Sequence, residues 1–307
     1  MKALINHGDG ELAVDLTEIP TPEPGPSEAV VGVEAVAVNR GELRLLAMRP
    51  HGWRPGQDVA GVIVTAAADG SGPGEGTRVV AWPEQEGWAQ QVAVPTTHLA
   101  PLEPDVTFAQ AATLPIAGVT ALRVLRLGGD LSGRRVLVTG AAGGVGRFAV
   151  ELAAGSGAEV TGVAASPERA AGLMDLGAAD VVHQIDDAEG PFDLILESAG
   201  GASLEASIGL VAPGGTIAVF GNSSNTSAQV SFGDFRGKAG ARIVAFFVYE
   251  TGQPPTFGED LKLLADMIAD GSLHPQIGVE APWTEANTVF AALASREVNG
   301  KAVLLVD

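Results

Sequence analysis

The sequence predicts an α/β fold that combines a β-rich domain with a doubly wound parallel sheet. In residues 1 to about 108, short or alternating apolar runs are separated by Pro and Gly, which is typical of strands joined by turns. After residue 135, short apolar runs alternate with stretches of helical period, which is typical of a parallel sheet covered by helices. A length of 307 residues suits two domains of ordinary size.

The β-rich part contains four strand patterns and ends in a helical stretch. We predict strands over residues 29–38, 58–65, 77–82 and 90–94. The prolines of segment 21–26 cannot donate hydrogen bonds to a sheet, so we predict a turn-rich connector there. From residue 110 to 127 the pattern becomes helical, with interruptions at Pro115 and Gly118, and we place the domain boundary in this stretch.

The second part alternates strands with helices. We predict strands over residues 136–138, 159–164, 180–183, 194–197, 216–220 and 242–248. We predict helices over residues 144–155, 167–176 and 204–211, and a loop over the Ser- and Asn-rich residues 222–231. The remaining elements are a helix over 257–269, a segment over 276–281, a helix over 284–295 and a strand over 302–306.

A glycine-rich turn joins the first strand of this second part to its first helix. Residues 136–138 are apolar, Gly140, Gly143, Gly144 and Gly146 follow, and a helical period begins at Val145. A helix N-terminus presents unpaired N–H groups to an anion, and glycines let a pyrophosphate approach the backbone. The sequence therefore predicts a dinucleotide cradle, and the alternative is a tight turn that binds nothing.

The composition limits the possible partners. The formal net charge is −19, which repels nucleic-acid phosphates and anionic membranes, so we expect neither as a partner. No apolar run is long enough to span a membrane, and residues 1–14 contain His7, Asp9 and Glu11 where a signal peptide is apolar. We therefore expect a cytoplasmic protein that acts on a small molecule.

The residue types also limit the chemistry. The chain has no cysteine, which excludes disulfides, thiolate zinc sites, iron–sulfur clusters and a cysteine nucleophile. The histidines show no paired spacing suited to metal ligands, so we expect no bound metal; they are His7, His51, His98, His183 and His274.

Six motifs together resemble one protein family. They are Ala-Val-Asn at 37–39, Pro-Gly-Gln-Asp-Val-Ala-Gly at 55–61, Leu-Pro-Ile-Ala-Gly-Val-Thr-Ala at 114–121, the cradle at 136–146, Pro-Gly-Gly at 213–215 and Gly-Lys-Ala-Val at 300–303. Through their order and spacing, essentially the whole chain resembles the medium-chain dehydrogenase/reductase superfamily, in its zinc-free, zeta-crystallin-like quinone oxidoreductase branch.

The resemblance implies a domain organisation and an assembly. It implies a discontinuous GroES-like β-barrel catalytic domain over residues 1–112 and 255–307, and a Rossmann NADPH-binding domain over 113–254. It implies a homodimer in which edge strand 242–248 pairs across a two-fold axis. Zinc-dependent relatives have Gly-His-Glu where this chain has Gly-Gln-Asp at 56–58, so the resemblance also implies zinc-independent chemistry.

The second strand of the parallel sheet favours NADPH over NADH. NAD-binding proteins usually place a carboxylate at its tip, whereas this chain has Ala-Ala-Ser at 164–166. Ser166 and Arg169 match positions that contact the 2′-phosphate in NADPH-dependent relatives. The alternative is that Ser166 caps a helix and Arg169 is solvated. Arg147, just after the last glycine, either lies near the pyrophosphate or faces solvent.

The resemblance also indicates residues that line the cofactor. Gly221 and Asn222, and the run Phe246, Phe247 and Val248, match stretches around the nicotinamide. At least one of the two phenylalanines is a core residue, because neighbouring strand side chains point to opposite faces. The full predicted set is Thr120, Gly140, Ala142, Gly143, Gly144, Val145, Gly146, Ser166, Arg169, Gly221, Asn222, Phe246, Phe247 and Val248.

The chemistry implied is hydride transfer to a quinone or an α,β-unsaturated carbonyl, whose conjugation spreads negative charge without a metal. Asn39 matches a family asparagine near the nicotinamide, and its alternative is a turn residue after a strand. Many relatives have a tyrosine in the loop where this chain has residues 48–54, but the sole tyrosine here is Tyr249. Water, His51 and Tyr249 are therefore the candidate proton donors.

Two further points are open. Trp53, Trp82 and Trp88 are candidates for an aromatic substrate pocket, and we expect one of them in the site and the others in the core. The missing tyrosine also supports other functions on the same scaffold. These are a biosynthetic enzyme that catalyses a non-redox cyclisation or isomerisation, and a non-catalytic NADPH-binding protein.

Overall fold

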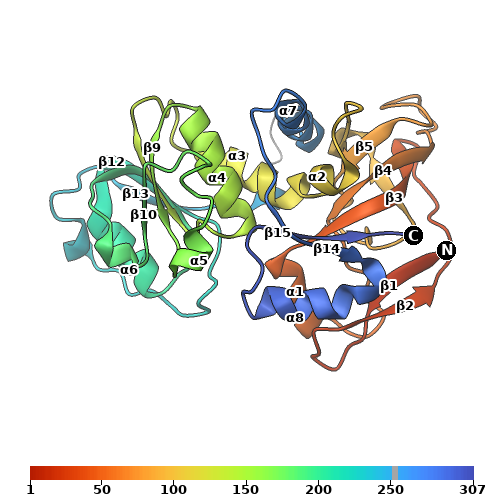
Figure 1. Cartoon of the computed structure of the whole chain (residues 1–307), viewed down its shortest axis with the longest axis horizontal. Helices are drawn as coiled ribbons and strands as arrows, with labels where there is room; N and C mark the ends of the chain where they lie inside the picture. Colours follow the sequence, from red (N-terminus) through yellow and green to blue (C-terminus); the bar gives the residue numbers. More distant parts are fainter. Residues whose placement is uncertain (251–254) are drawn as a thin grey trace. The chain divides into compact units, whose positions relative to one another are not determined.

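The computed structural model describes residues 1–250 and 255–307. These form two compact units (Figure 1). Unit 1 contains residues 1–119 and the described residues from Pro255 onward, and unit 2 contains residues 120–250. The first part of unit 1 thus ends at Val119, whereas the sequence suggests 112. The second expected boundary, between 254 and 255, lies at the edge of the residues that are not described.

Unit 1 is built on a mixed seven-stranded sheet. Its strand order is β14-β15-β3-β4-β5-β7, and β6 also pairs with β3. The strand β15, near the C-terminus, is antiparallel to β3, with Ala302 opposite Val38. This pairing brings Lys301 beside the end of β3. The bounds are β3 Glu28–Val38, β4 Asp58–Thr65, β5 Arg78–Ala81, β6 Gln91–Pro95, β7 Leu99–Pro101, β14 Ile277–Pro282 and β15 Lys301–Leu305, with β1 Lys2–Asn6 and β2 Val14–Glu18 in a separate antiparallel pair.

The helices of unit 1 include one that the sequence patterns did not predict. This helix, α1, directly follows β3 and begins after Asn39, whose backbone N–H donates to the carboxylate of Glu42. A π-helix, η2, occupies the stretch interrupted by Pro115 and Gly118. The bounds are α1 Arg40–Met48, η1 Thr96–His98, α2 Phe108–Ala112, η2 Leu114–Gly118, α7 Phe257–Ala269, η6 Trp283–Glu285 and α8 Ala286–Ala294.

Unit 2 contains the doubly wound parallel sheet that the sequence predicts. The strand order is β10-β9-β8-β11-β12-β13, and all neighbours are parallel. The chain order changes direction between β8 and β11, which is where such sheets bind their ligands. The bounds are β8 Arg135–Thr139, β9 Glu159–Val163, β10 Asp180–Val182, β11 Phe192–Glu197, β12 Val211–Val219 and β13 Arg242–Ala245.

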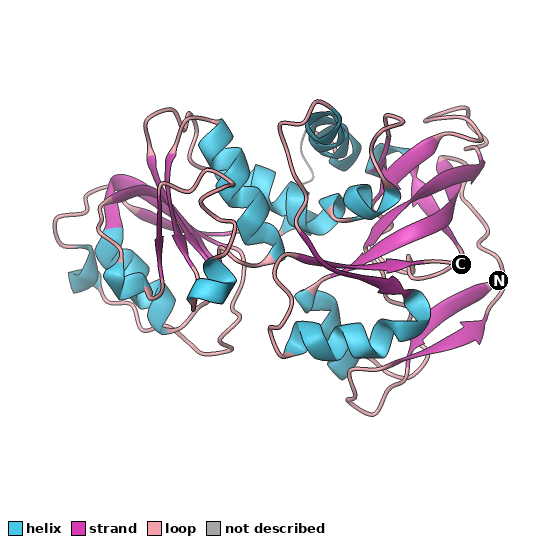
Figure 2. Ribbon diagram, viewed as in Figure 1, coloured by secondary structure: helices cyan, strands magenta, loops and turns pink. Residues whose placement is uncertain are grey.

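The helices of unit 2 pack on this sheet (Figure 2), with α4 against β8 and β9 and α6 against β11 and β12. The helix predicted over 167–176 ends at Ala170, because Gly172 adopts a left-handed φ of +79°. The strand predicted over 242–248 ends at Ala245. The bounds are α3 Val119–Arg126, α4 Gly144–Gly155, α5 Pro167–Ala170, η3 Ile185–Asp187, α6 Ala202–Leu210, η4 Phe232–Phe235 and η5 Val248–Glu250. In the described part of the chain, no helix has both the length and the apolar character needed to cross a membrane.

Candidate active site

The glycine turn has the geometry of an anion cradle. A Cβ on Gly146 would lie 2.4 Å from the carbonyl oxygen of Gly140, so only glycine lets α4 approach the turn so closely. Gly143 is the N-cap of α4 and supplies no side chain to cap it. The first N–H groups of this twelve-residue helix therefore point beyond the end of β8 without a side-chain acceptor. Ala141, which lies between Gly140 and Gly143 in this turn, is fully buried.

A buried acid that sequence reasoning missed orders the neighbouring loop. Glu197 ends β11 and accepts hydrogen bonds from the backbone N–H of Ala199 at 3.0 Å and of Gly200 at 2.9 Å. It also accepts from the Ser203 hydroxyl at 2.8 Å and from the Thr139 hydroxyl at 3.2 Å. The signal in the sequence is a charged residue that closes the apolar run 194–196. Because Thr139 ends β8, Glu197 ties this loop to the strand that leads into the glycine turn.

The end of β9 has the polar residues expected there. Ser166 is the N-cap of α5, and its hydroxyl accepts the backbone N–H of Arg169 at 3.4 Å, so the expected capping role is confirmed. The same hydroxyl hydrogen-bonds the exposed carboxylate of Glu168 and lowers the pKa of that acid. The side chain of Arg169 is half-buried. A cofactor phosphate at this loop would therefore meet one hydroxyl, one guanidinium and one carboxylate.

The structure excludes one of the two alternatives for Arg147, the solvent-facing one, and places its side chain against the glycine turn. Its side chain is only 6% exposed, so it does not face solvent. The guanidinium donates to the backbone carbonyls of Ala142 at 3.3 Å and Ala171 at 2.9 Å, so its donors bind the protein backbone. Burial, and then the positive charge of Arg169, lower the pKa of Arg147.

The stretches expected around the nicotinamide also belong to unit 2. Phe246 is buried and Phe247 is 57% exposed, which confirms that one of the pair is a core residue. The carbonyl of buried Val248 accepts a hydrogen bond from Arg123 at 3.3 Å. Asn222 is exposed, and its side chain donates to the carbonyl of Thr226 at 3.2 Å. Thr120, at the start of α3, is buried.

A second polar cluster lies in unit 1 and contains Asn39. Lys301 Nζ donates to Asp58 Oδ2 at 2.8 Å and to Asn39 Oδ1 at 2.6 Å. Asn39 Nδ2 donates to Asp58 Oδ2 at 2.9 Å and to Glu42 Oε2 at 3.2 Å. The N–H of Ile116, in the π-helix, donates to Asp58 Oδ1 at 2.8 Å. Asp58, Glu42 and Lys301 are all buried, so this buried quartet (Asn39, Glu42, Asp58 and Lys301) is a charged network inside unit 1.

The electrostatics of the buried quartet favour a protonated Glu42. Burial, followed by the negative charge of Asp58, raises the pKa of Glu42 to about 8. The hydrogen bonds from Asn39 and the positive charge of Lys301 act in the opposite direction and only partly offset this rise. With Glu42 protonated, the charges of Asp58 and Lys301 balance; with Glu42 ionised, the network has one excess negative charge.

Comparisons with known proteins identify the family. The family described as a zinc-binding dehydrogenase matches residues 144–266. The chain is 32% identical to the spectinabilin polyketide synthase system protein NorB of Streptomyces orinoci, over 96% of the chain and 14% of that protein. It is 31% identical to the chloroplastic quinone-oxidoreductase QR1 of Triphysaria versicolor, over 67% of the chain and 66% of that protein. A crystal structure of Escherichia coli quinone oxidoreductase complexed with NADPH has a TM-score of 0.88 and 21% identity, covering 99% of this chain and 100% of that one.

The chain belongs to the medium-chain dehydrogenase/reductase superfamily, in its zinc-free quinone oxidoreductase branch. The predicted fold class is confirmed by the parallel sheet of unit 2 and by the likeness to solved quinone oxidoreductases. The chain spans only 14% of the length of the polyketide synthase relative.

The family is described as zinc-binding, yet its zinc ligands are missing here. Zinc-dependent members of the superfamily use a histidine where this chain has Gln57, and this chain has no cysteine. The Gln57 side chain donates to the carbonyl of Glu84 at 2.9 Å. Across residues 1–250 and 255–307, no group of three or more acidic or histidine side chains is placed to hold a metal ion.

The amide of Asn39 is bonded to the charged residues around it. Both hydrogens of its amide nitrogen are donated to carboxylates, one to Asp58 and one to Glu42. In this structure both N–H groups of the Asn39 amide are used inside unit 1, and its expected hydrogen bond to a substrate carbonyl stays a prediction. Asn39 links the two buried acids to Lys301. Sequence reasoning used Asp58 and Lys301 only as family motifs and missed this link.

The two candidate proton donors lie in different units. His51, in unit 1, is exposed, and its Nδ1 hydrogen-bonds the carbonyl of His7 at 2.8 Å. Tyr249, in unit 2, is 51% exposed and lies in the turn η5. Both side chains therefore have surface available for proton exchange with water.

The three candidate substrate-binding tryptophans have different environments. Trp88 is fully buried against Phe290, with ring centroids 5.2 Å apart, so it is a core residue, as expected for two of the three. Trp82 is also buried, with its ring stacked on Phe257 at 4.2 Å. Trp53 is only partly buried and lies 5.9 Å from the guanidinium of Arg49. Of the three, Trp53 therefore has the most surface to offer to a substrate.

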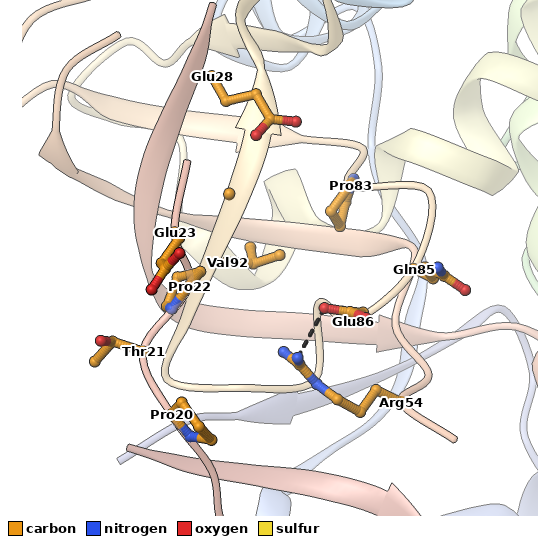
Figure 3. A pocket seen from close by; sticks show the side chains of 11 residues that line it. Pro20, Thr21, Pro22, Glu23, Glu28, Arg54, Pro83, Gln85, Glu86 and Val92 are labelled. Carbon is orange, nitrogen blue, oxygen red and sulfur yellow. Dashed lines mark ion pairs between the residues drawn. The ribbon is translucent and has the colours of Figure 1, made fainter. Parts of the chain in front are cut away.

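A separate cavity in unit 1 contains none of the predicted site residues. Figure 3 shows this cavity, of about 430 Å³, between the proline-rich connector and the loop after β5. The guanidinium of Arg54 pairs with Glu86 at 2.8 Å along its wall. The other lining residues are Pro20, Thr21, Pro22, Glu23, Glu28, Pro83, Gln85, Val92 and Ala93.

Proposed function

We propose that the chain is an NADPH-dependent oxidoreductase that transfers hydride to a quinone or an α,β-unsaturated carbonyl compound without zinc. The observation that carries the proposal is the uncapped glycine turn beside a loop with Ser166 and Arg169, where residues 164–166 at the tip of β9 include no acid and the first carboxylate is that of Glu168. The turn suits a pyrophosphate, and the loop suits a 2′-phosphate. The family membership supports redox chemistry with this cofactor.

The residues of unit 2 fit NADPH in specific ways. The N–H groups at the start of α4 would hold the pyrophosphate, and Ser166 and Arg169 would hold the 2′-phosphate. Backbone groups of Gly221 and of residues 246–248 would hold the nicotinamide carboxamide. When bound, the cofactor supplies a hydride to the acceptor. The Escherichia coli quinone oxidoreductase of the same fold was crystallised with NADPH.

The acceptor class follows from the polarising groups available. A simple ketone needs a strong electrophile on its oxygen, and zinc serves that purpose elsewhere in the superfamily. A quinone or enone instead delocalises the negative charge that hydride transfer creates. We propose that Tyr249, His51 or water returns the proton, because both side chains are exposed. Tyr249→Phe and His51→Asn, assayed separately, distinguish the two side chains, and unchanged turnover in both variants assigns the proton to water.

The test is acceptor-dependent oxidation of NADPH. Purified protein is mixed with NADPH and a panel of quinones and enones, and the loss of NADPH absorbance is followed. We expect turnover with at least one acceptor, unaffected by a zinc chelator. No turnover despite tight NADPH binding would contradict the redox proposal.

One observation favours a second candidate function. The loop 48–54 has no tyrosine, and one relative is named as part of a polyketide synthase system. A biosynthetic step without net redox change, such as a cyclisation or isomerisation, fits that departure, as does a non-catalytic NADPH-binding role. Product analysis by mass separates these options, because reduction adds two hydrogens, isomerisation adds none and a binding protein changes nothing.

We also propose that the protein is a homodimer through β13. This strand is the outer strand of the unit 2 sheet, and three of its four residues are exposed. An exposed edge offers unpaired backbone groups to a second copy. Light scattering should give twice the mass of one chain, and a monomeric mass would contradict the proposal.

A further inference from the structure

Arg147 connects two segments that lie far apart in the sequence. It lies in the first turn of α4, and its Nε donates to the carbonyl of Ala142 in the glycine turn at 3.3 Å. One of its terminal nitrogens donates to the carbonyl of Ala171 at 2.9 Å and to that of Arg169 at 3.4 Å. A single guanidinium thus joins the turn expected to bind the pyrophosphate to the loop expected to bind the ribose.

The local backbone is shaped to make these contacts. Helix α5 stops at Ala170, and the left-handed Gly172 turns the chain back, so the carbonyls of residues 169 and 171 point toward α4. A Cβ on Gly172 would lie 3.4 Å from a terminal nitrogen of Arg147, so the loop lies directly against the guanidinium. A planar guanidinium with five donors can bind several carbonyls at once, which an ammonium cannot reproduce.

The charge distribution also points to an anion. Among the described residues, no carboxylate forms an ion pair with Arg147, although the chain as a whole has a net charge of −19. The positive charge of Arg169 contributes, after burial, to lowering the pKa of Arg147. A phosphate bound at this loop would gain from the positive charge of both side chains.

We propose that Arg147 is a positioning residue that fixes Arg169 against the glycine turn and thereby sets the preference for a cofactor with a ribose 2′-phosphate. Arg147 acts in two ways: its guanidinium holds the backbone carbonyls of the 169–171 loop, and its positive charge attracts a phosphate bound at that loop. The inference rests on the proposed use of NADPH.

The test compares the dissociation constants of NADPH and NADH in titrations followed by cofactor fluorescence. In Arg147→Lys, we expect the ratio of the NADH constant to the NADPH constant to fall about tenfold, because charge-assisted bonds to the loop are lost. The matched control is Arg135→Lys, which removes a guanidinium that also binds loop carbonyls, those of Glu189 and Pro191, at the opposite end of β8. The control should keep the wild-type ratio.

The same Arg147→Lys substitution, made in an Arg169→Ala variant, separates a positioning role of Arg147 from a loss of structure that weakens all cofactor binding. In Arg169→Ala, the further change Arg147→Lys should leave the ratio nearly unchanged, because the group that Arg147 positions is gone. A merely structural role would weaken both cofactors equally and leave the ratio intact in every background. If Arg147→Lys does not fold, Gly172→Ala provides the second variant, since alanine is strained at the left-handed φ of +79°, which should shift the loop and lower the same ratio.

The outcomes distinguish this inference from the proposed function. A wild-type protein that binds NADPH no better than NADH would overturn the NADPH proposal and this inference with it. A wild-type preference for NADPH that survives in both Arg147→Lys and Gly172→Ala would overturn this inference alone.

Discussion

The buried acid Glu42 makes a prediction about stability against pH. Its pKa in the folded protein is about 8, against an ordinary value of 4.5, so the folded state holds a proton that the unfolded state releases between these values. The corresponding stabilisation is fully present below pH 4.5 and is lost as the pH rises through about 8. The full shift corresponds to at most about 5 kcal/mol of unfolding free energy.

The assay is urea unfolding followed by tryptophan fluorescence. All four tryptophans of the chain (Trp53, Trp82, Trp88 and Trp283) belong to unit 1, so the signal reports the unit that contains Glu42. Between about pH 6 and about pH 9, the unfolding free energy of the wild type should fall by about 3 kcal/mol, since about two pH units below the folded pKa lie in this range. Glu42→Gln should remove most of this fall, because its amide does not titrate. Equal pH dependence in the two proteins would refute the assignment of the proton to Glu42.

Three further predictions concern single acids or their partner. Lys301→Met should lower the unfolding free energy by about 3–5 kcal/mol in the same assay, because it leaves Asp58 buried without its counter-ion. The double variant that also has Asp58→Asn should recover part of this loss. A double variant as unstable as Lys301→Met would contradict the pairing of Lys301 with Asp58. Glu168→Gln should tighten NADPH about threefold by removing a carboxylate from the phosphate loop, and weaker NADPH binding would count against that placement. Glu197→Gln should weaken the binding of NADPH and of NADH alike by about tenfold, because the loop beside the glycine turn loses a carboxylate acceptor. A change in the ratio of the two dissociation constants would show that Glu197 acts elsewhere.

Features with a local sequence period could be predicted well. The helix over 144–155, the helix over 257–269 and the strand over 58–65 have the predicted bounds, because apolar spacing alone distinguishes them. Helix α1 was missed, since it has only nine residues and lies within a region whose other patterns predict strands. Its start was nevertheless visible, because Asn39 and Glu42 have the spacing of a capping box.

The contacts that shape the candidate site were harder to predict. Asn39 and Lys301 meet only because β15 pairs with β3, and a sequence pattern does not specify which distant strands become neighbours. The direction of the Arg147 side chain was equally hidden, because a residue after a glycine turn can point inward or outward. Its position depends on where α5 stops, and the predicted helix continued past that point.

The insertion of unit 2 within unit 1 has a consequence for the order of events during translation. Residues 120–250 leave the ribosome as an uninterrupted segment and can fold while synthesis continues. Strand β3, by contrast, waits for β15, which is translated more than two hundred and fifty residues later. Until β15 is synthesised, Asp58 lacks Lys301 as its partner and the edge of β3 that β15 covers stays open, so the nascent chain should depend on protection from aggregation at that edge.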